Sequence, residues 1–191
     1  MPHLRRSVAR QILAPASYSS RCHLSSYRYA AYGSNLHLLR LKKRVSSARQ
    51  LGVSFISTYD LGFNKRSNVD GSAKCNIIAG DRGVHIAVFE VASSQKADLD
   101  RIEGLGEGYN ELALIDPDFG ELLTYVADPS AVDDSLAPTD WYREMVLHGC
   151  KSNDFPSEYI RTIEAISSIE DTDEDRSRAQ WEIVEELRNG A

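Results

Sequence analysis

The sequence contains no aspartate or glutamate before Asp60, although 28 of its 191 residues are acidic. The first 59 positions hold ten basic residues and so carry +10, while the remaining 12 basic and 28 acidic residues give the rest of the chain −16. A basic segment of this kind is typical of contacts with nucleic acid or an anionic membrane, of a targeting sequence, or of a site for a small anion. The isoelectric point near 5.4 argues against a dedicated nucleic-acid-binding protein, and we expect no nucleic-acid partner.

Long apolar runs, cysteine pairs and metal-ligand spacings are also missing. No stretch approaches the roughly 20 apolar residues that a membrane-spanning helix needs, so we expect no membrane partner. The three cysteines, Cys22, Cys75 and Cys150, form no C-x-x-C pair and indicate buried or idle thiols in a reducing compartment. The five histidines show no metal-binding spacing, and we expect no metal site.

The whole sequence is 42% apolar and 26% charged, a composition typical of one globular domain. Residues 1–27 are rich in arginine and serine, which indicates either a mitochondrial-type transit peptide or a poorly ordered extension. We expect the domain itself to span residues 28–170, and an acidic helix to occupy residues 171–191. The expected compartment is the cytoplasm, or the mitochondrial matrix if the extension is a transit peptide.

Hydrophobic periodicity predicts an α+β protein, with a mixed sheet or small barrel and helices packed outside it. Strands are expected at residues 28–32, 53–59, 74–79, 83–91, 109–115 and 122–126, with a loop between the second and the third and a hairpin joining the last two. Helices are expected after residue 36, at 95–103, from 139 or 140 to 149, after Pro156, and from a capping box at Thr172 and Asp175 to the end.

The turn Gly33-Ser34-Asn35 lies between a predicted strand and a predicted helix. Glycine allows backbone N–H groups to approach a ligand closely, and a helix N-terminus favours negative charge, so this turn could hold an anion or an oxyanion. The alternative is an ordinary turn, in which Gly33 supplies a positive φ and Ser34 or Asn35 caps the helix.

Glu103 is predicted at the end of a helix, directly before a glycine-rich loop. A carboxylate held there is a candidate general acid or base, although a solvated side chain would fit the same pattern. Several tyrosines, Tyr29, Tyr32, Tyr109 and Tyr125 among them, fall on or beside predicted strands and could form either the core or the wall of a polar pocket.

Taken together, these segments resemble the γ-glutamylcyclotransferase family. The similarity extends from about residue 29 to residue 166, and Cys150 and Phe155 are modest departures from the family pattern. The motifs that carry it are the Tyr-Gly-Ser-Asn turn at residues 32–35, Leu99-Asp-x-x-Glu103-Gly104 with Gly108-Tyr109 after it, and residues 60–67, 70–76, 138–142, 148–151 and 155–159.

The resemblance implies a small mixed β-barrel flanked by α-helices and an enzyme that needs no cofactor. In such an enzyme the α-amine of a γ-glutamyl unit attacks its own γ-carbonyl, releasing 5-oxoproline and the attached amine. The resemblance implies that Glu103 is the base and that the turn Gly33-Ser34-Asn35 binds the substrate, with Tyr29, Tyr32, Tyr109 and Tyr125 around it.

Two other functions stay open. A relative specific for glutathione or for γ-glutamylamines would be expected to carry leucine in place of Asn35. A non-catalytic small-molecule-binding domain of the same fold would be expected to lack Glu103. The sequence leaves the choice between a monomer and a homodimer open.

Overall fold

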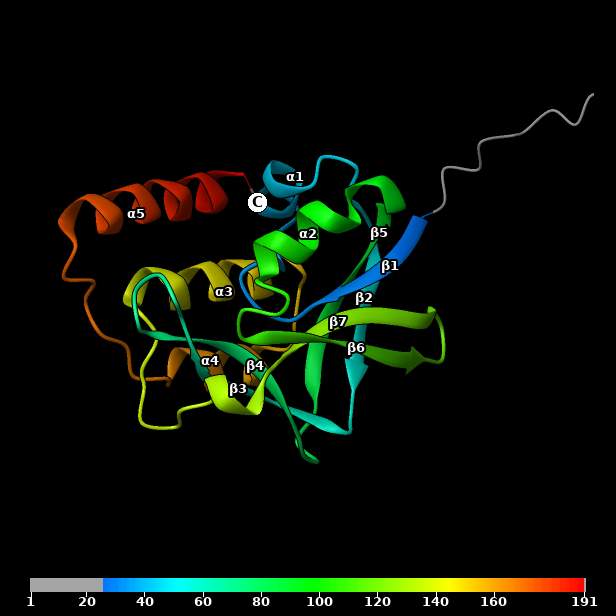
Figure 1. Ribbon diagram of the computed structural model, residues 1–191, viewed down its shortest axis with the longest axis horizontal. Coiled ribbons are helices and arrows are strands. Elements are labelled where there is room, and N and C mark those ends of the chain that lie inside the picture. Colours follow the sequence, from blue (N-terminus) through cyan, green and yellow to red (C-terminus); the bar gives the residue numbers. More distant parts are fainter. Residues whose placement is uncertain (1–25, 191) are drawn as a thin grey trace, which may run out of the picture.

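The computed structural model describes residues 26–190. The main sheet has five strands in the order β2-β5-β1-β7-β6, and β3 and β4 pair with each other as a separate hairpin (Figure 1). In chain order the elements are β1 (Ser26–Ala31), α1 (Leu38–Arg44), β2 (Arg49–Ile56), β3 (Tyr59–Arg66), β4 (Ala73–Ala79), β5 (Val84–Ala92), α2 (Lys96–Glu103), β6 (Tyr109–Asp116), β7 (Gly120–Ala127), α3 (Asp140–Ser152), α4 (Ser157–Glu164) and α5 (Glu174–Asn189).

The sheet is mixed, as the sequence predicts, because β1 pairs in parallel with β7 and antiparallel with β5. The α+β class and the flanking helices are therefore confirmed. A single core joins the sheet to the helices, and α5 packs along α3 (Figure 1). Val184 and Leu187 of α5 are fully buried in that core. The division of the chain at residues 28 and 170 stays a prediction.

The expected closed barrel is wrong, because β2 and β6 stay at opposite edges of an open sheet. The sheet curls until side chains from its two ends meet. The Ser54 hydroxyl of β2 donates to the Asp116 carboxylate, and a Cβ on Gly52 would come within 2.9 Å of the Phe119 ring. Side chains thus occupy the space in which backbone pairing would close a barrel.

The sequence also predicts a loop where the structure has β3. Residues such as Asp60, Gly62 and Asn64 disfavour strands on their own, but β3 gains a complete antiparallel partner in β4. Strand β3 buries two polar side chains, Asn64 and Lys65, which are 5% and 6% exposed. Tertiary pairing therefore overrides local propensity here.

Helix ends differ in detail from the sequence prediction. The N-cap of α1 is His37, whose Nδ1 accepts from the Leu39 N–H, and neither Ser34 nor Asn35 caps this helix. The N-cap of α5 is Asp173, so the predicted capping box at Thr172 is wrong by one residue. The predicted end of α2 is correct, because Gly104 terminates it in the left-handed conformation with φ of 74°.

Candidate active site

A small cavity of about 30 Å³ lies at the junction of β1, β7 and the end of α2. Every residue that the sequence nominates for the site lines it. These residues are Tyr29, Tyr32, Gly33, Ser34, Asn35, Glu103, Tyr109 and Tyr125. The fold therefore brings together segments separated by up to about 95 positions, and Glu103 and the glycine turn face the same space.

The position of Glu103 in this cavity is set by its neighbours in α2 and by two hydrogen bonds to its carboxylate. Fully buried Leu99 anchors α2 one turn earlier, and Gly104 ends the helix directly after the carboxylate. The Tyr29 hydroxyl donates to Oε1 of Glu103 over 2.7 Å, and the Asn35 amide donates to the same oxygen. No hydrogen bond from residues 26–190 reaches Oε2, which leaves that oxygen able to accept a proton from a ligand.

The two donors are themselves held in place. Burial, and then the adjacent Glu103 charge, raise the pKa of Tyr29 well above its ordinary value, so its hydroxyl keeps its proton. The Arg44 guanidinium donates to Oδ1 of Asn35 over 2.9 Å. Because an amide has one acceptor end and one donor end, this contact turns the Asn35 NH₂ group toward Glu103.

The turn before α1 has unused backbone donors. Among residues 26–190, no group accepts a hydrogen bond from the N–H of Gly33, Ser34 or Asn35. Gly33 does not have the positive φ that an ordinary turn would require. Glycine is needed there because a Cβ would lie 3.0 Å from the Cβ of Cys75. The turn is thus packed tightly against β4 and presents free N–H groups beside the cavity.

The other three tyrosines contribute ring surface, because each hydroxyl already donates to a protein acceptor. Tyr32 donates to the Tyr125 carbonyl, Tyr109 donates to the Cys75 carbonyl over 2.6 Å, and Tyr125 donates to Asp100 over 2.5 Å. Burial raises the pKa of all three above the ordinary value, which keeps them protonated and uncharged. They form the walls of the cavity.

Three more residues line the cavity: Cys75, Thr124 and Tyr142. Tyr142 is one of the tyrosines that the sequence already offers as core or pocket wall, whereas sequence reasoning missed Cys75 and Thr124. Burial raises the pKa of Cys75 to about 12, so this thiol is not a thiolate at neutral pH. Only Tyr142 gave a signal, since it stands at the start of a predicted helix. The other two depend on how β4 and β7 pack against the glycine turn.

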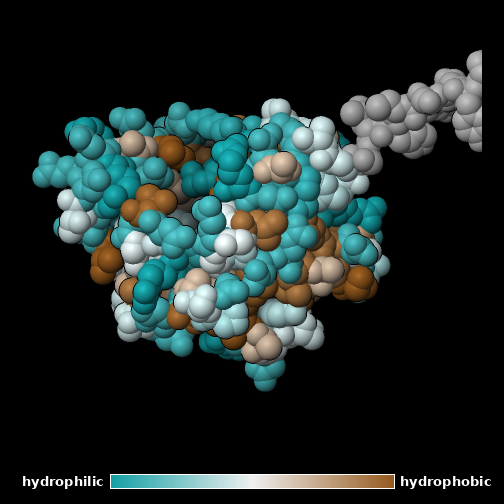
Figure 2. Space-filling view, in the orientation of Figure 1, coloured by the Kyte–Doolittle hydropathy of each residue, from teal (hydrophilic) through white to brown (hydrophobic). Residues whose placement is uncertain are grey.

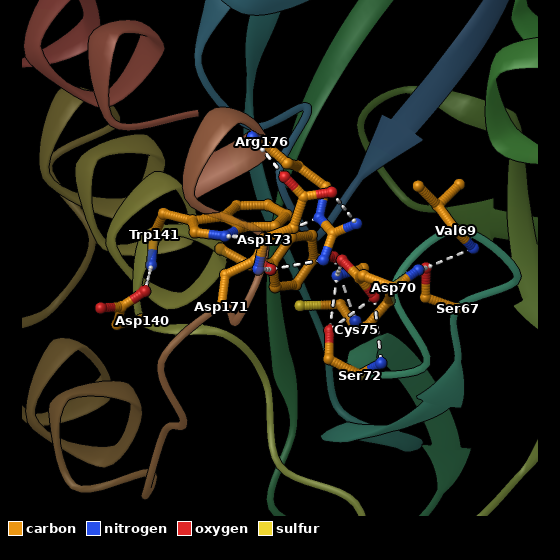
Figure 3. Close-up of polar contacts among 12 residues, drawn as sticks. Ser67, Val69, Asp70, Ser72, Cys75, Asp140, Trp141, Asp171, Asp173 and Arg176 are labelled. Atoms are coloured by element: carbon orange, nitrogen blue, oxygen red, sulfur yellow. Dashed lines mark hydrogen bonds and ion pairs between the residues drawn. The ribbon is translucent and has the colours of Figure 1, made fainter. Parts of the chain in front are cut away.

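An outer cleft of about 340 Å³ adjoins the cavity, and the two share Ser34, Glu103, Tyr109 and Tyr142. The β3–β4 connection, α1, α2, α3 and α5 all contribute to its wall. Part of that wall is drawn in Figure 3, where Arg176 of α5 meets Asp171 beside Trp141, with Asp70 and Ser72 nearby.

The surface in the orientation of Figure 1 is mainly hydrophilic, with apolar residues scattered over it (Figure 2). No helix among the described residues is long and apolar enough to cross a membrane. Within residues 26–190, no group of three histidine, cysteine or acidic side chains is arranged to hold a metal ion.

Comparisons with known proteins point to one fold. A solved γ-glutamyl cyclotransferase superposes with a TM-score of 0.70 at 23% identity, covering 85% of this chain and 99% of that one. An uncharacterized protein from Homo sapiens gives 0.68 at 23% identity, covering 84% and 98%. YkqA from Bacillus subtilis gives 0.62 at 14% identity, covering 75% and 56%. No family model and no curated protein matches the sequence.

The chain therefore has the γ-glutamylcyclotransferase-like fold. The resemblance noted in the sequence is confirmed at the level of that fold, over nearly the whole length of the solved γ-glutamyl cyclotransferase.

Proposed function

We propose that this protein is a γ-glutamylcyclotransferase, which converts a γ-glutamyl amino acid into 5-oxoproline and a free amino acid. The observation that carries the proposal is the Glu103 carboxylate, anchored through Oε1 and free at Oε2, in the same cavity as the unused N–H groups of the glycine turn. The fold shared with a solved γ-glutamyl cyclotransferase supports it.

The reaction begins with proton removal. An α-amine has a pKa of about 8, so most of it is protonated at neutral pH and cannot attack. Oε2 of Glu103 takes one proton from this ammonium group, and the resulting amine attacks the γ-carbonyl carbon of the same molecule. A new C–N bond closes a five-membered ring, and the carbonyl oxygen becomes an oxyanion.

The second step breaks the original amide. Glu103 returns its proton to the departing nitrogen, the oxyanion collapses to a carbonyl, and the old C–N bond breaks. The ring nitrogen, which still holds two protons after its attack, gives up one of them, and the released amine takes up that proton as an ammonium group. Neither water nor a protein nucleophile enters the balance. N–H groups of Gly33, Ser34 and Asn35 would stabilise the oxyanion or hold the α-carboxylate of the γ-glutamyl unit. Folding the substrate for intramolecular attack supplies the remaining acceleration.

Replacing the base tests the proposal. The wild-type protein should release 5-oxoproline from a panel of γ-glutamyl amino acids, and Glu103→Gln should lower kcat by at least about a hundredfold. Glutamine preserves the shape of the side chain and its acceptor oxygen, so the variant should unfold at a similar temperature. Glu158→Gln is the matched control, since Glu158 is exposed on α4, lines neither the cavity nor the outer cleft, and should leave activity nearly unchanged.

Three outcomes would redirect the assignment. Full activity of folded Glu103→Gln would overturn the role of the base. Turnover of glutathione alone would move the protein to the glutathione-specific alternative, and absence of turnover with every amide would favour a binding domain.

A further inference from the structure

The outer cleft is rich in positive charge, and part of that charge is already neutralised. Lys74 pairs with Asp70 over 2.7 Å, and Arg101 pairs with Asp98 over 3.3 Å. Arg176 pairs with Asp171, a contact visible in Figure 3. These three cations therefore have partners within the protein.

Arg40 of α1 is different. It is only 8% exposed, its Nε is buried without a hydrogen-bond partner, and no carboxylate among residues 26–190 pairs with it. Burial, together with the nearby Arg44 charge, lowers the pKa of Arg40 to about 9, so it still carries its charge at neutral pH. A buried cation with no partner is costly, and an anion in the cleft would offset that cost.

Lys65 of β3 is a second buried cation in the wall of the outer cleft. It is 6% exposed and has no ion-pair partner among the described residues. Its ammonium group lies 4.7 Å from the centre of the Tyr109 ring, and Tyr109 lines both the inner cavity and the outer cleft. Gly108 makes this position available, because a Cβ there would lie 3.0 Å from Cε of Lys65. Lys65 therefore stands at the boundary between the two spaces.

Both cations line the outer cleft together with Glu103. In an α-amino acid the carboxylate is attached to the carbon that bears the amide nitrogen. A substrate whose scissile nitrogen is next to Glu103 must therefore hold this carboxylate within a few ångströms of the catalytic group. The unpaired cations occupy that neighbourhood.

We propose that Arg40 and Lys65 bind the free carboxylate of the departing amino acid and so determine the specificity of the enzyme. This inference rests on the proposed function and adds to it the residues that select the leaving group. A γ-glutamyl derivative whose leaving group has no negative charge leaves both cations buried and unpaired, and is accordingly a poor substrate.

The test compares γ-glutamyl-alanine with γ-glutamyl-alaninamide, which has the same shape and no carboxylate charge. We expect kcat/KM to be at least about tenfold higher for the charged substrate, mainly through KM, as for a hydrogen-bonded charge in a partly buried site. Equal kcat/KM values would overturn this inference and leave the proposed function intact. Absence of 5-oxoproline from both would overturn the proposed function and this inference with it.

Variants then assign the preference to residues. Arg40→Met and Lys65→Met remove the charge while keeping a long side chain, and each should reduce the ratio between the two substrates by at least about threefold. Arg101→Met is the control, because Arg101 lies on the same cleft with its own acidic partner, and it should keep the wild-type ratio. Lys65→Met provides an independent measurement if Arg40→Met does not fold.

Three results contradict the assignment. The ratio of kcat/KM between the two substrates could stay at the wild-type value in both Arg40→Met and Lys65→Met. The ratio could also fall equally in Arg101→Met, which would indicate an effect of the total positive charge of the cleft. The variants could also lose activity equally on both substrates, and this loss relative to the wild type could disappear once the α-carboxylate of the γ-glutamyl unit is amidated. That pattern would place the cations at the other end of the substrate.

Discussion

The Tyr29 hydroxyl donates a hydrogen bond of 2.7 Å to Oε1 of Glu103, although the two residues are 74 positions apart in the chain. Tyr29 belongs to β1, a central strand, and Glu103 ends α2. The contact therefore ties the end of a helix to the central strand of the sheet. Asn35 binds the same oxygen, so the orientation of the carboxylate depends on two separate segments.

Removing the Tyr29 hydroxyl should impair catalysis more than substrate binding. In Tyr29→Phe, Oε1 keeps only the Asn35 donor, and we expect kcat to fall by about tenfold with KM changed less than about twofold, as for loss of one hydrogen bond to a charged group. Steady-state release of 5-oxoproline measures both constants. Tyr27→Phe is a suitable control, since the Tyr27 hydroxyl is buried and has no hydrogen-bond partner within the described part of the chain. A larger change in KM than in kcat would contradict the positioning role.

The orientation of Asn35 should depend on Arg44. In Arg44→Met, Oδ1 of Asn35 loses its donor, and the amide can rotate so that oxygen faces the Glu103 carboxylate. We expect kcat to fall by about three- to tenfold. Lys43→Met is the matched control, because the neighbouring Lys43 pairs with Glu186 on the surface and should leave kcat unchanged. Equal losses in the two variants would indicate a general charge effect instead.

The two buried thiols should resist modification in the folded protein. Burial raises the pKa of Cys75 to about 12 and raises the pKa of Cys150 as well, so almost no thiolate exists at neutral pH. With Cys22→Ser as background, an aromatic disulfide reagent should react with fewer than about one thiol in ten before unfolding and with both thiols in denaturant. Rapid reaction of one thiol in the native protein would contradict the burial of that side chain.

Stability should decrease on mild acidification. Burial lowers the pKa values of His37, His85 and His148, so the unfolded chain binds protons more readily than the folded one. The free energy of unfolding is therefore highest above about pH 6.5, and it should fall as the pH drops below that value, by at most about 1.4 kcal/mol per pH unit for each histidine.

Denaturant unfolding between about pH 7.5 and 5.5 measures this slope, in a range above the titration of ordinary carboxylates. His148→Gln should reduce the slope, because it removes one titrating group. A slope that is zero or of the opposite sign in the wild-type protein would contradict neutral histidines in the folded state.

The sequence determined much of the local structure. Glycine in the left-handed conformation ends α2 where the sequence predicts it, because Gly104 alone among its neighbours tolerates that backbone at no cost. The hairpin of β6 and β7 and the strand β5 also lie close to their predicted ranges. In each case the information is local: alternating apolar residues, a turn sequence, or a helix stop.

The motifs also grouped the candidate site residues, which the fold places around one cavity. The sequence offers Ser34 or Asn35 as the cap of α1, and neither is the cap, since the Asn35 side chain binds Glu103 and Arg44 instead. Capping by Asn is a strong local preference, and only the packing of β1 against α2 offers this side chain a stronger, charged partner.

Only the tertiary structure decided three features. β3 forms because β4 pairs with it, despite a sequence that disfavours strands. The sheet remains open because Ser54, Asp116 and Phe119 fill the gap between its ends. Arg40 and Lys65 look like ordinary surface cations in the sequence, yet the fold buries them in the cleft beside Glu103 with no acidic partner among residues 26–190. Burial and pairing are properties of distant segments in contact, so a local pattern determines where elements begin and end, while their packing determines which charges are left for a ligand.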